Sequence, residues 1–304
     1  LTGNPQITFF KVVYRRHTNF ALEAIQQTFN GTVDFGRKVT ATISRNGDLI
    51  HKMYLQVDLP ALTSGTTAAW TRNIGHVLIN NVEIEIGGQR IDKHYGEWLH
   101  IWSELTQTAE HEDGYNVMIG NTAELTTPAA SIPSARLYVP LQFWFNRNPG
   151  LALPLIALQY HEVKINLEFR PASECTVGSP TGTPSLSDAS LYVDYVFLDT
   201  DERRQFAQVA HEYLIEQLQF TGAESFSNSS VKSKLNFNHP CKELVWVVQL
   251  DSNVDGGENR WTDFTDNGTG ANDYAGNDPM SDAKLQLNGH DRFSVRNAAY
   301  FNLI

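Results

Sequence analysis

Several short segments of the chain alternate between apolar and polar residues. Residues 53–59, 82–86, 163–169 and 191–197 each place apolar side chains at every second position. Because successive side chains of a strand point to opposite faces, this period of two predicts strands with one buried and one solvated face. Residues 95–105 differ, since their apolar positions fall on a single helical face. The chain is therefore predicted to be mostly β, with a helix inserted after a hairpin.

Some short motifs occur twice in the same order. The matched pairs are FNG at 29–31 with FTG at 220–222, WT at 70–71 with WT at 261–262, and IEIGG at 84–88 with LQLNG at 285–289. The first two pairs are separated by the same interval, and the third interval is longer. The additional residues fall within 263–282, a Gly-, Asn- and Asp-rich stretch that is typical of a surface loop. Ordered matches of this kind indicate two tandem units rather than chance similarity.

The segment KLQLNGHDRF at residues 284–293 predicts a strand, a tight Asn-Gly turn and a second strand. In the repeat it matches a hairpin in the middle of the first unit. A second unit of similar length would need on the order of a hundred further residues. The sequence thus predicts a first unit with its N-terminal arm over 1–200, a linker over 201–210 and an incomplete second unit over 211–304.

Charge and composition restrict the classes of function. The net charge of −11 disfavours direct binding of nucleic acid, which requires clustered cations. No apolar run approaches the roughly 20 residues of a membrane-spanning helix. The two cysteines, Cys175 and Cys241, form no disulfide framework, and free thiols suit a reducing compartment.

Motifs for catalysis and for metal or cofactor binding are missing, so the sequence predicts neither an enzyme nor a cofactor. Asp251, Asn253 and Asp255 match the start of a calcium loop, but Thr262 occupies the twelfth position, where a bidentate Glu is expected. A solvated loop is favoured over a metal site there. Residues 110–113 (EHED) are likewise interpreted as an exposed charged turn rather than a metal cluster.

Three Asn-x-Ser/Thr tripeptides begin at Asn30, Asn228 and Asn267. They are candidate glycosylation sites only where the protein meets a glycosylation machinery. Such tripeptides arise often by chance in a chain rich in Asn and Thr.

Six longer segments carry a resemblance to a known family. They are LTGNPQITFFK at 1–11, YRRHTNF at 14–20, ISRNGDL at 43–49, IGGQRID at 86–92, NPGLALPLIALQYHEV at 148–163 and HEYLIEQLQF at 211–220. The chain resembles the major capsid proteins of nucleocytoplasmic large DNA viruses, most strongly those of the algal-virus (chlorovirus) branch. The resemblance implies an all-β fold of two tandem eight-stranded jelly rolls, the second truncated in this chain.

The resemblance also implies a structural function. Three copies would form a homotrimer whose six jelly rolls give a near-hexagonal capsomer, and capsomers would tile an icosahedral shell. Implied partners are neighbouring capsomers and minor capsid proteins, with an inner viral membrane adjacent to the shell but not spanned. The expected location is the virion, after assembly in the host cytoplasm. Some members carry glycans on outer loops, which favours Asn267 among the three candidates.

Contacts between copies are predicted in the N-terminal arm and in the connector at 199–209. The arm candidates are Phe9, Phe10, Tyr14, Arg15 and Arg16. Simple core packing is an equally good interpretation of the aromatic residues.

An alternative function is a carbohydrate-binding or host-attachment jelly roll. It would use aromatic side chains in the loop at 251–282, namely Trp261 and Tyr274, which that hypothesis expects to be exposed. An enzyme on a jelly-roll scaffold is disfavoured by the missing motifs.

Overall fold

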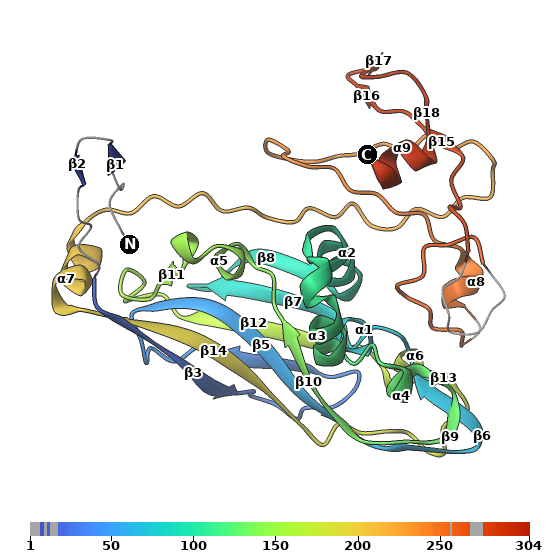
Figure 1. Ribbon diagram of the computed structural model, residues 1–304, viewed down its shortest axis with the longest axis horizontal. Coiled ribbons are helices and arrows are strands. Elements are labelled where there is room, and N and C mark those ends of the chain that lie inside the picture. The colour runs from blue at the N-terminus through green and yellow to red at the C-terminus, as the bar shows by residue number, and fades with distance from the viewer. Residues whose placement is uncertain (1–6, 9–10, 13–17, 256, 268–275) are drawn as a thin grey trace.

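The computed structural model describes residues 7–8, 11–12, 18–255, 257–267 and 276–304. Two antiparallel sheets dominate its first two thirds (Figure 1). One sheet has the strand order β10 (Ala135–Pro140), β5 (Leu49–Leu59), β14 (Asp188–Leu198), β3 (Phe20–Thr28), with β11 (Leu153–Pro154) also paired to β5. The other has the order β4 (Lys38–Thr42), β12 (Val163–Phe169), β7 (Ile79–Ile86), β8 (Gln89–Tyr95).

Successive long strands mostly alternate between the two sheets, which is the arrangement of a jelly roll. A smaller sheet of β13 (Thr176–Gly178), β6 (Leu62–Trp70) and β9 (Ala129–Ile132) extends one end. Near the N-terminus, β1 (Ile7–Thr8) pairs with β2 (Lys11–Val12). The predicted all-β jelly-roll fold is confirmed, with four strands in each main sheet and the two-residue β11 added to the first.

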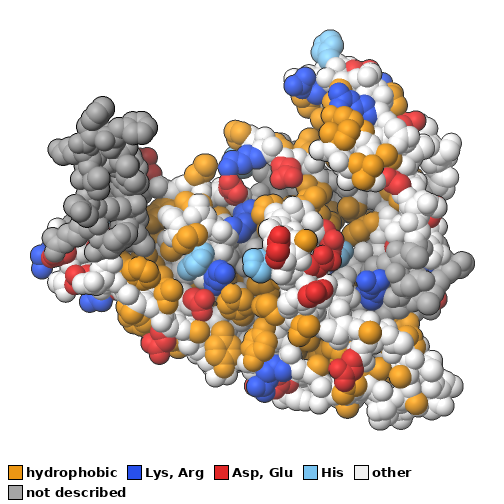
Figure 2. Space-filling view, viewed as in Figure 1, with side chains coloured by type: hydrophobic (Ala, Val, Ile, Leu, Met, Phe, Trp, Pro, Cys, Tyr) orange, Lys and Arg blue, Asp and Glu red, His pale blue; other side chains and the backbone are white. Residues whose placement is uncertain are grey.

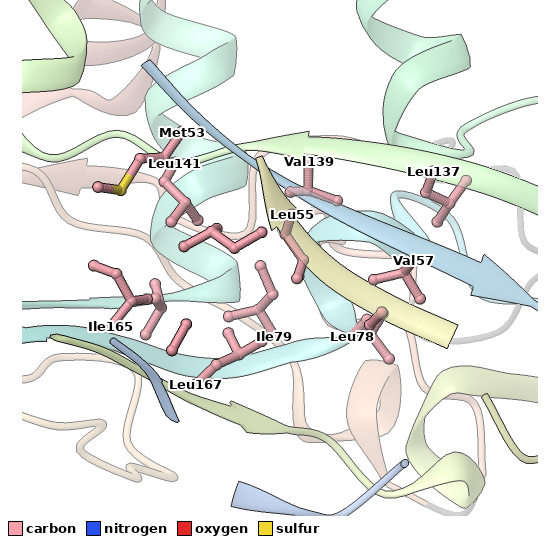
Figure 3. Packing of buried hydrophobic residues seen from close by; sticks show 14 of the residues in the cluster. Met53, Leu55, Val57, Leu78, Ile79, Leu137, Val139, Leu141, Ile165 and Leu167 are labelled. Carbon is pink, nitrogen blue, oxygen red and sulfur yellow. The ribbon is translucent and has the colours of Figure 1, made fainter. Parts of the chain in front are cut away.

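The core lies between the two sheets and follows the predicted alternation. In β12, Val163, Ile165, Leu167 and Phe169 are buried while the residues between them are half-exposed. Figure 3 shows side chains of β5, such as Leu55, converging with those of β12 and β7 between the sheets. Each apolar side chain buried in this way contributes about 1.5–3 kcal/mol to folding.

Helices occupy the connections between strands. They are α1 (Ile74–Val77), α2 (Gly96–Thr106), α3 (Ala109–Ile119), α4 (Ala123–Thr126), α5 (Trp144–Arg147), η1 (Pro149–Leu151), α6 (Ala172–Cys175), α7 (Thr200–Gln208), α8 (Asp251–Val254) and α9 (Ala298–Leu303). The helix expected over 95–105 is α2. The expected charged turn at 110–113 is wrong, because these residues lie within α3. There Glu110 and Glu112 lie in the first turn, where acidic side chains favour a helix.

The second part of the chain is largely extended. Within its described residues the strands are β15 (Asp282–Ala283), β16 (Gln286–Leu287), β17 (His290–Asp291) and β18 (Arg296–Asn297). Residues 211–250 cross the first jelly roll without regular structure and expose apolar groups such as Leu214, Phe226 and Trp246 (Figure 1). The strands that a second jelly roll would place in this region are not formed, because a strand without neighbours leaves its backbone groups and apolar face uncovered.

The predicted Asn-Gly hairpin is confirmed. Leu287 pairs with His290 across Asn288 and Gly289, whose φ angles are 51° and 81°. In the β7–β8 hairpin, Gly87 and Gly88 have φ angles of 60° and 84°. Both turns therefore place two consecutive residues in the left-handed region, as a two-residue hairpin of this type requires.

We expect replacement of Gly96 by Ala to lower the free energy of unfolding by about 1–3 kcal/mol, because a side chain there overpacks the site. Its Cβ would lie 2.5 Å from the carbonyl oxygen of Ile79 and closer still to that of His76. Urea unfolding measures the loss. Gly114→Ala in α3 is the control, since nothing lies within 4 Å of its Cβ and Ala favours a helix interior by about 0.5–1 kcal/mol. Equal stability of the two variants would contradict the expected clash.

Candidate assembly surface

The predicted linker is largely a helix anchored to the first jelly roll. The carboxylate of Asp48 accepts hydrogen bonds from Nε and Nη2 of Arg203, both at 3.0 Å, and from the backbone N–H of Leu198 at 2.7 Å. Phe206 packs against an apolar cluster of Leu49, Ala152, Val196 and Leu198. Arg203 and Phe206 thus attach this helix to the first jelly roll.

The arm residues predicted to make contacts between copies are not tested by the structure. Phe9, Phe10, Tyr14, Arg15 and Arg16 all lie outside the residues whose side chains it describes. Their assignment stays a prediction.

An apolar patch that the sequence analysis did not identify lies on β3. This strand forms one edge of its sheet, and Phe20 and Leu22 are 61% and 63% exposed. They pair with Leu198 and Val196 of β14 and so share a sheet face with them. Phe206 packs against that part of β14 but leaves Phe20 and Leu22 open. The sequence did contain a signal for this patch. Within residues 20–25, apolar residues occur at both even and odd positions, so a strand there carries apolar side chains on both faces.

The outer face of this sheet also carries tyrosines and an ion pair. Tyr54 and Tyr192 are directly paired, and Tyr138 is 39% exposed. Nearby, Asp58 accepts two hydrogen bonds from Arg136, at 2.6 and 2.7 Å, which hold the pKa of this carboxyl below its usual range. Figure 2 shows hydrophobic groups between charged ones over the region of β3, β14 and β5. Tyrosine-rich, mixed surfaces of this kind are enriched at protein–protein interfaces.

A stretch of the extended segment covers the free edge of the other sheet at β8. The backbone N–H of Leu218 donates to Oδ1 of Asp92 at 3.2 Å, and Gln217 donates to the carbonyl oxygen of Ile91. The ring of Phe220 meets that of Tyr95 edge-on, with 5.1 Å between centroids. These contacts protect an edge that would otherwise offer unpaired backbone groups.

The loop that matches the start of a calcium motif is not a plain solvated loop. The short helix α8 begins at Asp251 and includes Asn253. The side chain of Asn253 is fully buried. Its Oδ1 accepts a hydrogen bond from Arg260 at 2.9 Å, so this oxygen already has a cationic partner. The side chains of Asp251 and Asp255 are exposed. Within the part of the chain that the structure describes, no group of three or more His, Cys, Asp or Glu side chains could hold a metal ion.

The aromatic pair proposed for carbohydrate binding is not an exposed pair. Trp261 packs against the core of the first jelly roll, and its Nε1 donates to the carbonyl oxygen of Glu174 at 2.9 Å. The guanidinium of Arg170 lies 4.1 Å from the centroid of its ring. Tyr274 lies outside the described residues. The expectation that Trp261 is an exposed binding residue is therefore wrong.

The candidate glycosylation sites differ in exposure. Asn30 and Asn228 are exposed, whereas Asn267 is half-buried and its carbonyl oxygen accepts a hydrogen bond from Arg260 at 3.0 Å. Whether any of them carries a glycan stays a prediction.

A buried histidine cluster lies where the second part of the chain meets α1, α2 and α3. Nε2 of His76 is 2.8 Å from the hydroxyl of Tyr115, and the ring of His76 lies 6.1 Å from that of His100. The ring of His100 stacks on Phe264 at 6.4 Å. Burial lowers the pKa of His100 to about 4 and the pKa of His76 well below its usual value. Both imidazoles are consequently neutral near pH 7, and they gain a proton only in acid.

No helix within the described ranges combines the length and hydropathy required to cross a membrane.

Comparisons with known proteins connect this architecture to a family. A family model described as "Major capsid protein N-terminus" matches residues 8–199, and one described as "Large eukaryotic DNA virus major capsid protein" matches residues 202–304. The major capsid protein of Pyramimonas orientalis virus is 58% identical over 307 residues, covering 100% of this chain and 71% of the relative. The major capsid protein of Phaeocystis pouchetii virus is 58% identical over 84% of this chain, which spans 56% of that relative's length.

Solved structures agree with the sequence matches. The crystal structure of VP54 from PBCV-1 superposes with a TM-score of 0.81 and 40% identity, covering 97% of this chain and 76% of VP54. The major capsid protein of Paramecium bursaria Chlorella virus 1 is 45% identical over the whole of this chain and 73% of its own length. With the jelly-roll sheets already established, these matches show that the chain belongs to the major capsid protein family of large eukaryotic DNA viruses.

Proposed function

We propose that the chain is a structural subunit that self-assembles as a homotrimer. In this proposal residues 1–200 supply a first jelly roll, 201–210 a linker and 211–304 part of a second jelly roll. The six jelly rolls of a trimer would form a near-hexagonal capsomer, and capsomers would tile an icosahedral virion shell. The identity of 58% to a major capsid protein across 100% of the chain is the observation that carries the proposal.

The role that follows is mechanical rather than catalytic. A closed ring of copies needs two different surfaces on each copy that fit one another. The partners proposed here are further copies of the chain, neighbouring capsomers and minor capsid proteins, in the virion and after assembly in the host cytoplasm. An inner viral membrane would lie next to the shell without being spanned. The second match to a solved structure, the quasi-atomic model of the PBCV-1 capsid with a TM-score of 0.75, supports the shell arrangement by similarity.

The contacts between copies are assigned in this proposal to the N-terminal arm and to the apolar patch of β3. Phe20 and Leu22 are large apolar side chains on an edge strand. Exposed apolar groups on such a strand favour association with a further chain.

We expect Leu22→Asp to lower the association constant of the trimer by about tenfold or more. Each factor of ten corresponds to about 1.4 kcal/mol of association free energy. The variant should fold normally, because Leu22 is exposed in the single chain. Sedimentation of the full-length protein over a concentration series measures the effect. Val117→Asp is the control, since Val117 is 64% exposed on α3, away from β3. A monomeric wild-type protein would contradict the proposed homotrimer. Equal weakening of the trimer by both variants would show that β3 does not lie in the interface.

A further inference from the structure

Residues 249–267, with Gly256 outside the described residues, form a segment that is seated on the first jelly roll. We call it the docking segment. Its seat consists of the loop before α1 and the turn around α6, at the end of the jelly roll where the small sheet begins. Figure 1 shows the loop next to α8 approaching the end of the first jelly roll at which α1 and α6 lie. The contact joins residues that are nearly two hundred positions apart in the chain.

Asn259 is the centre of the contact. Its Nδ2 donates to the carbonyl oxygens of Ser173 and Thr176, both at 2.7 Å. Its own carbonyl oxygen accepts a hydrogen bond from Oγ1 of Thr71 at 2.6 Å. Asn259 is 4% exposed and Thr71 is fully buried. Buried donors and acceptors that satisfy one another in this way specify a single docked arrangement, because any shift leaves them unpaired.

Neighbouring residues enlarge the contact on both sides of Asn259. Trp261 lies against Arg170 and Glu174, as described above, and Nδ2 of Asn73 donates to Oγ1 of Thr262 at 3.0 Å. The ring of Phe264 reaches His100 on α2. The seat is therefore contacted by consecutive residues of the docking segment rather than by one side chain.

The docking segment is also braced by contacts within itself. Arg260 is 1% exposed and binds Asn253 and Asp263 within the same segment. Asn259 has a φ angle of 52°, in the left-handed region that Asn adopts more readily than most residues. An internally braced segment loses little further conformational entropy on docking.

We propose that docking of residues 249–267 onto the first jelly roll fixes the two parts of the chain as one rigid building block, and that capsomer formation depends on this rigidity. The assembly part of this inference rests on the homotrimer proposed above. Residues 211–248, which connect α7 to the docking segment, have no regular structure of their own, and residues 217–220 within them contact the edge of β8 as described above. A ring of heterologous contacts closes only if the angle between its units is fixed.

Two variants and a matched control test the inference in the full-length protein. Asn259→Asp replaces the Nδ2 donor by an oxygen that faces two carbonyl oxygens. Thr71→Val removes the hydroxyl donor with almost no change of shape, and serves if the first variant does not fold. Asn288→Asp is the control: Asn288 has a φ angle of 51°, so the same substitution is made in the same backbone conformation, on an exposed turn.

Amide hydrogen exchange in residues 249–267 and 170–176 reports docking, and sedimentation reports the trimer. We expect Asn259→Asp and Thr71→Val to raise exchange in both stretches by about tenfold or more and to weaken the trimer, with Asn288→Asp unchanged in both measurements. Unchanged exchange in both variants would overturn the docking. Raised exchange in a variant that still forms a stable trimer would overturn the proposed role of docking in assembly. A wild-type protein that is monomeric would instead overturn the proposed homotrimer, and with it the assembly part, while the exchange result still decides the docking.

Discussion

Asp263→Ala is expected to lower the free energy of unfolding by about 3–5 kcal/mol, the usual cost of removing one partner of a buried ion pair. The carboxylate of Asp263 accepts a hydrogen bond from Nη1 of Arg260 at 3.2 Å, and both side chains are at most 1% exposed. It also accepts from the backbone N–H and the hydroxyl of Thr265, at 3.0 and 2.8 Å. Without Asp263, the buried guanidinium of Arg260 would keep the weaker partner Glu258, an exposed carboxylate 3.9 Å from its Nε. Urea unfolding followed by tryptophan fluorescence measures the loss.

The control for this variant is Asp255→Ala, which removes an exposed carboxylate from the same segment and should change stability by no more than about 0.5 kcal/mol. The double variant Arg260→Met, Asp263→Leu should recover much of the lost stability, because well-packed apolar residues often replace a buried ion pair without cost. If Asp263→Ala were as stable as Asp255→Ala, the buried pair would have no structural role.

Lowering the pH from 7 to 4 is expected to destabilise the fold by about 3 kcal/mol through His100 alone. Its pKa falls from 6.5 to about 4 on folding, chiefly through burial, and each pKa unit corresponds to about 1.4 kcal/mol. Because the folded-state pKa is the lower one, the stability is fully present above pH 6.5 and is lost as the pH falls toward 4. His76 shifts in the same direction and adds to the loss.

The charged and titratable neighbours of the buried histidines do not reverse the expected loss of stability in acid. Arg72 lowers the pKa of His100 further, and Tyr115 has a raised pKa, so it stays neutral throughout the acid range. Burial raises the pKa of Glu104, which favours the fold at low pH and offsets part of the loss.

Urea unfolding at pH 7 and at pH 4 tests the prediction. His100→Gln should flatten the dependence on pH, whereas His111→Gln should not, because His111 is exposed on α3. A steep dependence that persists in His100→Gln would assign the acid sensitivity to other groups.

The strands of the first jelly roll could be predicted from the sequence because their signal is local. Alternation in residues 163–169 is sufficient to place four side chains in the core, and the Asn-Gly pair at 288–289 is sufficient to predict a turn. The strand β6 was not predicted, because most of its residues are Thr, Ser, Gly or Ala and show no clear alternation.

The docking segment could not be predicted for a different reason. A stretch rich in Asp, Asn and Gly has the composition of a solvated loop, and only its distant partners make it a buried one. Arg and Asp side chains are seldom fully buried unless they are paired. No local sequence pattern predicts the buried pair of Arg260 and Asp263. The same holds for Trp261, whose partners Arg170 and Glu174 lie about ninety positions earlier.

The pairing of β3 with β14 has a consequence for synthesis on the ribosome. Phe20 pairs with Leu198, so the first strand of the jelly roll has no neighbour until nearly two hundred residues have been made. At translation rates of about 5–20 residues per second, this strand waits on the order of ten seconds or more for its partner. During that time the backbone groups of β3 that will bond to β14 stay unpaired and can pair with a strand of another chain. The rate of elongation then sets how long each new subunit is at risk of aggregation before its first sandwich can close.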